Sequence, residues 1–285
     1  MSVQVPGKTF LLGEYSVLAG GSALLLGTSP TFKKSSNIQK YHPDSAVARF
    51  LKSSDFNEVI NDYSVGGFGK SSAEFILAWI DKNPDAIVNG QLNQLQIKNI
   101  FQDYKNLFSK SISQQPSGAD VVGQCLGQVT WFKPDVEEST VHSWPHPDLG
   151  FYLVATGYKQ LTHDHLAQLD RALLTDLVAV SDRAIVDFFK SAQDFISSLK
   201  NWSQLLQTQG LTAENSVNLK KSLEKNPEIL CAKPCGALGA DVLFVLFQTE
   251  KRSVVDRILQ DMNLSIKASE LSLARLIIDF KKDRE

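Results

Sequence analysis

Chemistry suited to holding a phosphate is concentrated in one short stretch, made of Gly66, Gly67, Phe68, Gly69, Lys70, Ser71 and Ser72. Glycine has no Cβ, so its backbone can turn with a positive φ and approach a ligand closely. Residues 73–80 contain no glycine or proline and favour a helix. A glycine turn that leads into a helix offers free N–H groups to an anion, and Lys70 adds a positive charge. The stretch therefore predicts a phosphate site, with a plain glycine turn as the alternative.

The end of this stretch matches the last part of a Walker A loop, but the beginning does not. In the pattern G-x-x-x-x-G-K-[ST], the first glycine would fall on Ser64. Residues 61–65 also lack the apolar run of a buried parallel strand. The sequence therefore argues against a P-loop nucleotide hydrolase.

The elements predicted around this stretch are a mixture of strands and helices. Strands are predicted at residues 3–5, 23–26, 129–132, 151–155 and 242–247, and a turn at Pro6-Gly7 is expected to end the first of them. Helices are predicted at residues 45–51 with Asp44 as the cap, over about 92–108, over 165–208 with breaks, and at 254–262. Residues 134–149 are rich in proline, histidine and acidic side chains, so two domains are predicted, 1–146 and 147–285.

Composition and charge are those of an ordinary globular chain. Of the 285 residues, 43% are hydrophobic and 21% charged, and 29 basic against 31 acidic residues leave a net charge of −2. So small a charge provides no general basis for binding nucleic acid or an anionic membrane. Apolar runs such as residues 242–247 are far shorter than the ~20 residues of a membrane helix, and residues 1–12 lack a signal-peptide pattern. The expected compartment is the cytoplasm.

Two groups of residues raise the possibility of a metal site, and neither is complete. The cysteines Cys125, Cys231 and Cys235 lack a second pair of ligands, so reduced thiols are favoured over a zinc site. His163 and His165 flank one acidic residue without a third ligand nearby, which favours a solvated loop.

Four motifs follow one another along the chain: Pro6-Gly7-Lys8, the stretch 66–72, Pro116-Ser117-Gly118-Ala119-Asp120, and residues 233–240. Together they resemble the motifs of the GHMP small-molecule kinases, a family that includes galactokinase, homoserine kinase, mevalonate kinase and phosphomevalonate kinase. The family's G-L-G-S-S-A motif is similar to residues 67–72, and its K-x-x-G-A-G-G-G motif to residues 233–240. The resemblance extends from residue 5 to about 247. It implies an α+β fold of two domains with the active site in the cleft between them.

The resemblance also implies a role for each motif. The stretch 66–72 would bind ATP, with Ser71 at the family's Mg²⁺-serine position. Asp120 would act on the hydroxyl of the substrate, and Lys8 would support the charge that develops during transfer. Substrate contacts would come from Glu14, Tyr15, Ser117, Gly118, Gly236 and Ala237. The implied cofactors are ATP and Mg²⁺.

The motifs point to the mevalonate branch of this family but divide between two substrates. Gly13-Glu14-Tyr15 and Asp241 resemble phosphomevalonate kinase, whereas residues 116–120 resemble the P-S-G-x-D of mevalonate kinase. The implied activity is phosphorylation of mevalonate or 5-phosphomevalonate in isoprenoid precursor synthesis, by a monomer or homodimer whose partner is a small molecule. The alternatives are a binding or regulatory protein of the same fold, and a kinase for another small alcohol such as homoserine or a sugar.

The sequence departs from the family pattern at several positions. The magnesium-binding glutamate eleven residues before the aspartate is replaced by Ser109, so the metal would rely on Ser71, Glu14 or water. Lys70 replaces a small residue, and Leu238 and Ala240 replace glycines. A pocket for 5-phosphomevalonate would also need cations beyond Lys8, because an unpaired phosphate is costly to enclose. The candidates are Lys110, Lys159, Lys233, His163 and His165.

Overall fold

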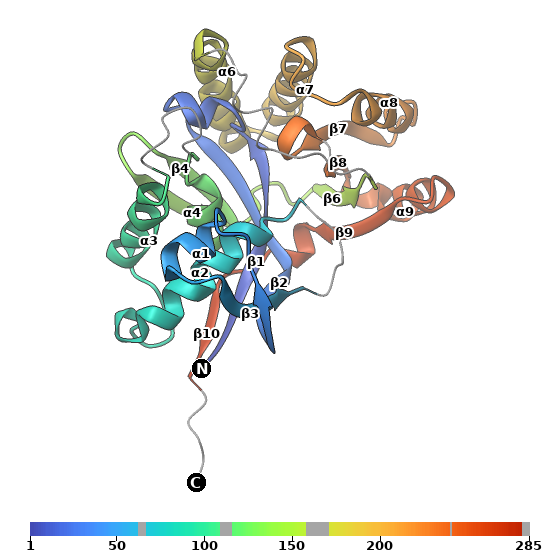
Figure 1. Cartoon of the computed structure of the whole chain (residues 1–285). Coiled ribbons are helices and arrows are strands. Elements are labelled where there is room, and N and C mark those ends of the chain that lie inside the picture. The colour runs from blue at the N-terminus through green and yellow to red at the C-terminus, as the bar shows by residue number, and fades with distance from the viewer. Residues whose placement is uncertain (62–66, 109–115, 158–170, 240, 281–285) are drawn as a thin grey trace.

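A computed structural model of the chain describes residues 1–61, 67–108, 116–157, 171–239 and 241–280, which form two antiparallel sheets with helices packed against them (Figure 1). Within these residues the first sheet has the order β10-β1-β2-β4-β5, with β3 also paired to β2. Its strands are β1 (Ser2–Leu12), β2 (Ala23–Lys40), β3 (Asp55–Ile60), β4 (Val129–Lys133), β5 (Glu138–His142) and β10 (Ile277–Asp279). The second sheet has the order β7-β8-β6-β9, with β6 (Leu149–Ala155), β7 (Ile229–Cys235), β8 (Val242–Gln248) and β9 (Ser265–Ser269).

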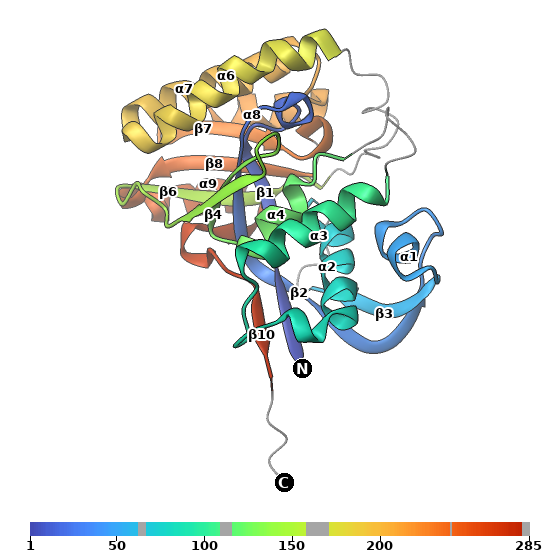
Figure 2. The same ribbon diagram turned by 90° about the vertical axis from the view of Figure 1, so that its left-hand side faces the viewer.

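The helices divide between the two sheets. Helices α2 (Lys70–Lys82) and α4 (Ala119–Leu126) pack against β1, and α3 (Gln94–Asn106) packs on α4 (Figure 2). Helices α7 (Ala192–Thr208) and α8 (Glu214–Leu223) cover β7, while α9 (Arg252–Asp261) contacts β8 and β9. Two further α-helices are α1 (Ala46–Leu51), which packs on α2, and α6 (Arg171–Lys190), which packs on α7.

Helix α2 is the centre of the first half of the molecule. Every residue from Ser72 to Ile80 is buried, so this helix is enclosed on all sides. A helix that is apolar all round is stable only when neighbours cover each face, and each large apolar side chain buried there contributes about 1.5–3 kcal/mol. This enclosure fixes the start of α2, and therefore the glycine stretch before it, against β1 and α4.

Most of the predicted elements are confirmed, including the mixture of helices and strands. Helix α2 ends before Pro84 as predicted, and the break expected within 165–208 falls at Ser191, between α6 and α7. Ser191 caps α7, because its side chain accepts a hydrogen bond from the backbone N–H of Asp194.

Two local predictions are wrong. Pro6-Gly7 does not end the first strand: β1 continues to Leu12, and the pairing with β2 shifts register between Pro6 and Gly7. An irregularity of this kind accommodates a proline inside a strand. The cap of α1 is Ser45, which accepts from the N–H of Ala48, and not Asp44. The two residues are adjacent polar caps, and the backbone favours the later one.

The last strand returns to the first sheet. Residues Ser2, Val3 and Gln4 of β1 pair with Asp279, Ile278 and Ile277 of β10. The division at residues 146 and 147 stays a prediction, and this strand crosses it. Among the described residues, none of the helices combines the length and apolar character required to span a membrane.

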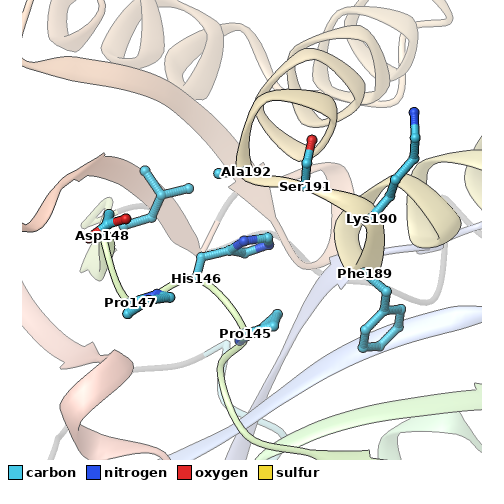
Figure 3. A pocket seen from close by; sticks show the side chains of 9 residues that line it. Pro145, His146, Pro147, Asp148, Phe189, Lys190, Ser191 and Ala192 are labelled. Carbon is cyan, nitrogen blue, oxygen red and sulfur yellow. The ribbon is translucent and has the colours of Figure 1, made fainter.

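A hollow of about 250 Å³ lies where the segment before β6 meets the junction of α6 and α7 (Figure 3). Residues 145–149 line one side of it and residues 189–192 the other. The imidazole of His146 stacks on Phe195, with 5.1 Å between ring centroids, and burial lowers the pKa of His146. This histidine therefore packs as a neutral ring. None of the predicted site residues that the structure describes lines this hollow, so it is separate from the described part of the candidate site.

Candidate active site

The predicted catalytic residues Lys8 and Asp120 form an ion pair. Lys8 lies in the middle of β1 and Asp120 in the first turn of α4, and Lys8 Nζ is 2.6 Å from Asp120 Oδ1. Gly118 turns the chain into α4 with a φ of 76°, and a Cβ there would lie 2.5 Å from the Phe101 ring. A glycine is thus needed two residues before the carboxylate, which explains the spacing of the motif.

The two side chains differ in how much of each is exposed. The Lys8 side chain is 11% exposed and that of Asp120 is 37% exposed. Asp120 Oδ1 is covered by protein and, although it is close to Lys8 Nζ, makes no well-oriented hydrogen bond in the structure. The accessible part of Asp120 is therefore the side away from Oδ1, where an incoming hydroxyl could reach it.

The glycine stretch lies directly over this pair. The backbone N–H of Lys8 donates to the carbonyl of Phe68 at 2.9 Å. Gly67 and Gly69 both have positive φ values, 88° and 80°. A Cβ on Gly69 would lie 2.9 Å from Lys8 Cε. The structure thus brings residues 67–72 together with Lys8 and Asp120, while Gly66 lies outside the described residues.

The side chains of this stretch point in different directions. Phe68 and Ser72 are buried, so Phe68 could contact a nucleotide only through its backbone. Lys70 and Ser71, at the first turn of α2, are exposed. Burial raises the pKa of Glu74 to about 7, and the charge of Lys70 opposes this shift. Below neutral pH Glu74 is therefore largely uncharged and does not repel an anion at the helix start.

The buried residue Gln124, which the sequence analysis did not single out, contacts several segments of the site. Its side-chain amino group donates to the carbonyls of Pro6 at 2.9 Å and Gly69 at 3.1 Å. Its oxygen accepts from the hydroxyl of Ser72 at 2.6 Å. The only sequence signal is a polar side chain in an otherwise apolar short helix, and that signal does not reveal the partners.

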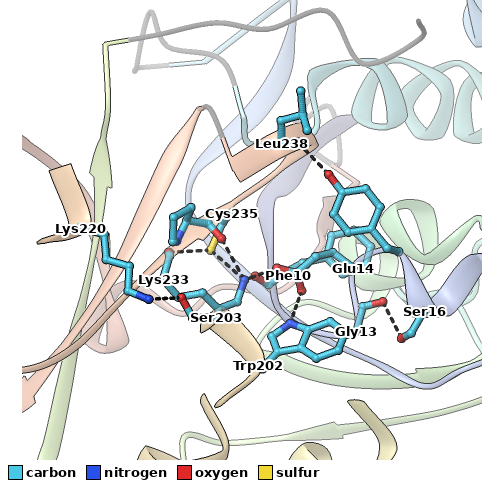
Figure 4. A network of polar contacts seen from close by, with 12 residues as sticks. Phe10, Gly13, Glu14, Ser16, Trp202, Ser203, Lys220, Lys233, Cys235 and Leu238 are labelled. Carbon is cyan, nitrogen blue, oxygen red and sulfur yellow. Dashed lines mark hydrogen bonds and ion pairs between the residues drawn. The ribbon is translucent and has the colours of Figure 1, made fainter. Parts of the chain in front are cut away.

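Glu14 and Lys233 form a second ion pair, which joins the two sheets (Figure 4). Lys233 is fully buried at the end of β7 and donates to the carboxylate of Glu14 and to the carbonyl of Pro234. The other carboxylate oxygen of Glu14 accepts from the indole N–H of Trp202 at 3.1 Å. Binding of Mg²⁺ or substrate by Glu14, or of a substrate phosphate by Lys233, would first require this pair to break. We therefore do not propose those roles for the two residues.

Tyr15 contacts the motif at residues 233–240. Its hydroxyl accepts a hydrogen bond from the N–H of Leu238 at 2.9 Å, and burial raises the pKa of Tyr15 to about 12. Leu238, at a position where the family has glycine, adopts a left-handed φ of 50°. Its carbonyl accepts from the N–H of Ala213 at 2.7 Å. Hydrogen bonds at both its N–H and its carbonyl hold a leucine in a conformation that costs it energy.

The end of the motif at residues 233–240 also lies against the glycine stretch, at the next residue, Asp241. A Cβ on Gly67 would be 2.5 Å from the Cβ of Asp241. Gly236 makes a turn in this motif, with a φ of 90°. In the turn that leads to Asp120, the hydroxyl of Ser117 accepts a hydrogen bond from the N–H of Ala119. All four motifs are therefore connected by short contacts through Lys8, Gly67 and Tyr15.

Several predicted residues cannot be placed, because they lie outside the described residues: Gly66, Ser109, Lys110, Lys159, His163, His165 and Ala240, together with the side chain of Ala237. Among the residues that the structure does describe, no group of three or more His, Cys, Asp or Glu side chains could hold a metal ion. Cys125, Cys231 and Cys235 are buried free thiols.

The chain has the GHMP kinase fold, as the motifs predicted, and comparison with solved structures shows it over nearly the whole length. Phosphomevalonate kinase of Streptococcus pneumoniae, solved with phosphomevalonate and AMPPNP, is similar with a TM-score of 0.71 at 14% identity, covering 94% of this chain and 99% of that one. Methanococcus jannaschii mevalonate kinase has a TM-score of 0.67 at 15% identity, with coverages of 94% and 97%. Lactococcus lactis galactokinase, solved with galactose, has a TM-score of 0.71 at 11% sequence identity, covering 98% of this chain and 95% of that one. Neither a family model nor a curated protein matches the sequence.

Replacing Gly69 by Val is expected to abolish nucleotide binding. Valine is β-branched and disfavours a φ of 80°, and its Cβ would lie 2.9 Å from Lys8 Cε, beneath the predicted phosphate position. Titration calorimetry with AMPPNP on the folded variant measures the effect. Gly210→Val is a matched control, because Gly210 also has a positive φ of 70° but nothing within 4 Å of an added Cβ. Unchanged affinity in a folded Gly69→Val protein would remove this stretch from the nucleotide site.

Proposed function

We propose that the chain is an ATP-dependent small-molecule kinase that phosphorylates mevalonate or 5-phosphomevalonate. The observation that carries the proposal is the position of the Lys8–Asp120 pair, joined at 2.6 Å and lying directly under the glycine turn that begins α2. Phosphoryl transfer needs held phosphates, neutralised charge and a placed hydroxyl, and these three parts supply them. Support for the substrate comes from the mevalonate kinases and phosphomevalonate kinases that share the fold.

Each part of the site has one task in this reaction. Backbone N–H groups of residues 67–72 and the start of α2 bind the phosphates of ATP. Asp120 accepts the proton of the acceptor hydroxyl. The oxygen of that hydroxyl bonds to the γ-phosphorus of ATP, and the bond between this phosphorus and the ADP oxygen breaks. Lys8 faces the negative charge that develops on the transferred group. The contact between Gly69 and Lys8 keeps the phosphates and the cation together.

The residues at the site fit a magnesium ion held mainly by the nucleotide. Mg²⁺ prefers oxygen ligands, keeps several waters and often takes only one or two protein groups beside the phosphates. The exposed hydroxyl of Ser71 would hold it together with water. When bound, the ion would neutralise charge on the phosphates. Glu14 is excluded from this set by its buried pair with Lys233.

The proposed reaction is tested by ADP release from purified protein with ATP and a panel of acceptors: mevalonate, 5-phosphomevalonate, homoserine and galactose. Saturable release with one of the first two is the expected result. Activity only with homoserine or galactose would assign another kinase activity. Binding of AMPPNP without transfer to any acceptor would favour the binding or regulatory alternative.

Lys105 is a cation near Asp120 that could hold the anionic group of the acceptor. It lies in the last turn of α3, and its Cδ would be 3.7 Å from a Cβ on Gly118. Its ammonium group is 5.7 Å from the Phe101 ring centre and has no ion pair within the described ranges of the chain. A carboxylate or phosphate on the acceptor would supply the missing partner.

Replacing Lys105 by Met is therefore expected to raise KM for an anionic acceptor by roughly 10-fold or more, the range for a hydrogen bond to a charged group. KM for ATP should stay unchanged. Lys82→Met is the matched control, because Lys82 also lies over an aromatic ring, that of Phe50, but on the far end of α2. Steady-state kinetics with the acceptor and with ATP as the varied substrate measures the two KM values. An unchanged acceptor KM would exclude Lys105 from the substrate pocket.

A further inference from the structure

We infer that Gln124 is a positioning residue that holds the three parts of the phosphoryl-transfer site in register, an inference that rests on the proposed function. Gln124 is fully buried in α4. It lies four residues after Asp120, so both side chains project from the same face of the helix. Its amide reaches two other segments, β1 and the glycine stretch. One side chain therefore connects the three segments that carry the site: β1 with Lys8, the glycine stretch, and α4 with Asp120.

The amide of Gln124 uses its full donor capacity in these contacts. Its two N–H groups go to the carbonyls of Pro6 and Gly69, at 2.9 and 3.1 Å. Carbonyl oxygens only accept hydrogen bonds, so the amino group must face them, and this sets the orientation of the amide. The amide oxygen then faces Ser72, whose hydroxyl oxygen lies 2.6 Å from it and 3.0 Å from the Gly69 carbonyl oxygen. The network is satisfied in only one arrangement.

Each partner of Gln124 is next to a group that performs the chemistry. Pro6 lies two residues before Lys8 in β1, at the register shift of that strand. Gly69 is the residue from which α2 starts, and Ser72 lies in the first turn of α2. Loss of the amide would leave the Pro6 and Gly69 carbonyls without these donors and would free α4 to move relative to β1. A displacement of about 1 Å in such a site lowers turnover about 10²-fold.

If Gln124 only filled the core, its replacement would change stability and not turnover. A variant that keeps the size of the side chain but cannot form its hydrogen bonds distinguishes this packing role from a positioning role. Gln124→Met keeps the size of the side chain and removes all three hydrogen bonds. We expect kcat to fall about 10²-fold and AMPPNP affinity to weaken in protein that is still folded. Cys125→Ala is the control, because Cys125 is the next residue in α4, is buried and is a free thiol. That control should lower the melting temperature while kcat per folded molecule stays unchanged.

Gln124→Glu provides a second readout that a purely structural role would not produce. A protonated glutamic acid can donate to one carbonyl and still accept from Ser72, whereas the ionised form places negative oxygens against both carbonyls. Burial raises the pKa of a glutamate, so the favourable form persists at low pH. AMPPNP affinity of Gln124→Glu should therefore fall as pH rises through that pKa, beyond any change seen in the natural protein over the same range.

The outcomes separate this inference from the proposed function. Normal kcat in folded Gln124→Met, or a pH profile of AMPPNP affinity in Gln124→Glu that follows the natural protein, would overturn the positioning role. If Gln124→Met does not fold, the Gln124→Glu titration decides alone. If the natural protein phosphorylates no acceptor but binds AMPPNP, the proposed reaction fails while the affinities of the two variants still test Gln124. No AMPPNP binding by the natural protein would overturn both.

Discussion

Replacing Asp120 by Asn is expected to lower kcat at least ~10²-fold while AMPPNP binding is kept, because an amide of the same shape cannot accept the proton of the acceptor hydroxyl. The loss should appear in kcat and not in the affinity for nucleotide, since residues 67–72 that would hold the phosphates are unchanged. Turnover is measured with the best acceptor of the panel, and affinity by calorimetry.

The control for this prediction is Asp182→Asn, which alters another aspartate paired with a lysine. Asp182 lies 3.2 Å from Lys133 Nζ and also accepts from the N–H of Ser22. Its loss should leave kcat unchanged. Near-normal turnover of Asp120→Asn would remove that carboxylate from the mechanism and leave the Lys8 contact as a structural pair.

Replacing Lys233 by Met is expected to produce the largest loss of stability of any single change considered, about 3–5 kcal/mol in the free energy of unfolding. Lys233 has no exposed surface, and its removal leaves the carboxylate of Glu14 enclosed, with the Trp202 N–H as its one remaining side-chain donor among the described residues. A charge left unpaired in the interior is far more costly than the pair was favourable. Urea unfolding monitored by circular dichroism gives the value.

Two further variants separate the pair from general damage to the core. Glu14→Gln combined with Lys233→Met removes both charges and should recover a large part of the loss. Lys133→Met breaks the ion pair between Lys133 and Asp182, in which both side chains are about one-third exposed. This change should lower the free energy of unfolding by no more than about 1 kcal/mol. A Lys233→Met protein as stable as Lys133→Met would show that the buried pair contributes little.

The motifs could be predicted from the sequence because their chemistry depends on local backbone geometry. Gly69 and Gly118 carry positive φ values at helix starts, and a glycine one residue before a lysine or two residues before an aspartate indicates such a turn. The same local reasoning failed at Pro6-Gly7, where pairing with β2 over a long strand outweighed the turn preference of the dipeptide.

The roles of Glu14 and Gln124 depend on contacts between distant segments, which the sequence does not reveal. Glu14 and Lys233 are 219 positions apart, and the hydrogen bond from Gln124 to Pro6 spans 118. The resemblance assigned Glu14 to the substrate and the metal, whereas the observed fold encloses it between the two sheets. Local patterns thus predicted the glycine turns of the candidate site, and tertiary packing decided which charged groups lie beside them.

The return of β10 to the first strand has a consequence for the order in which the protein assembles. Residues 2–4 leave the ribosome early but find their partners only in residues 277–279, and Gly27 and Gln128 likewise exchange backbone hydrogen bonds with Ala274. Until that late segment is synthesised, the edge of β1 presents unpaired N–H and carbonyl groups, which invite association with other chains. The first sheet therefore cannot be completed during translation before residues 277–279 are made, and the edge at residues 2–4 stays open to pairing with other chains until then.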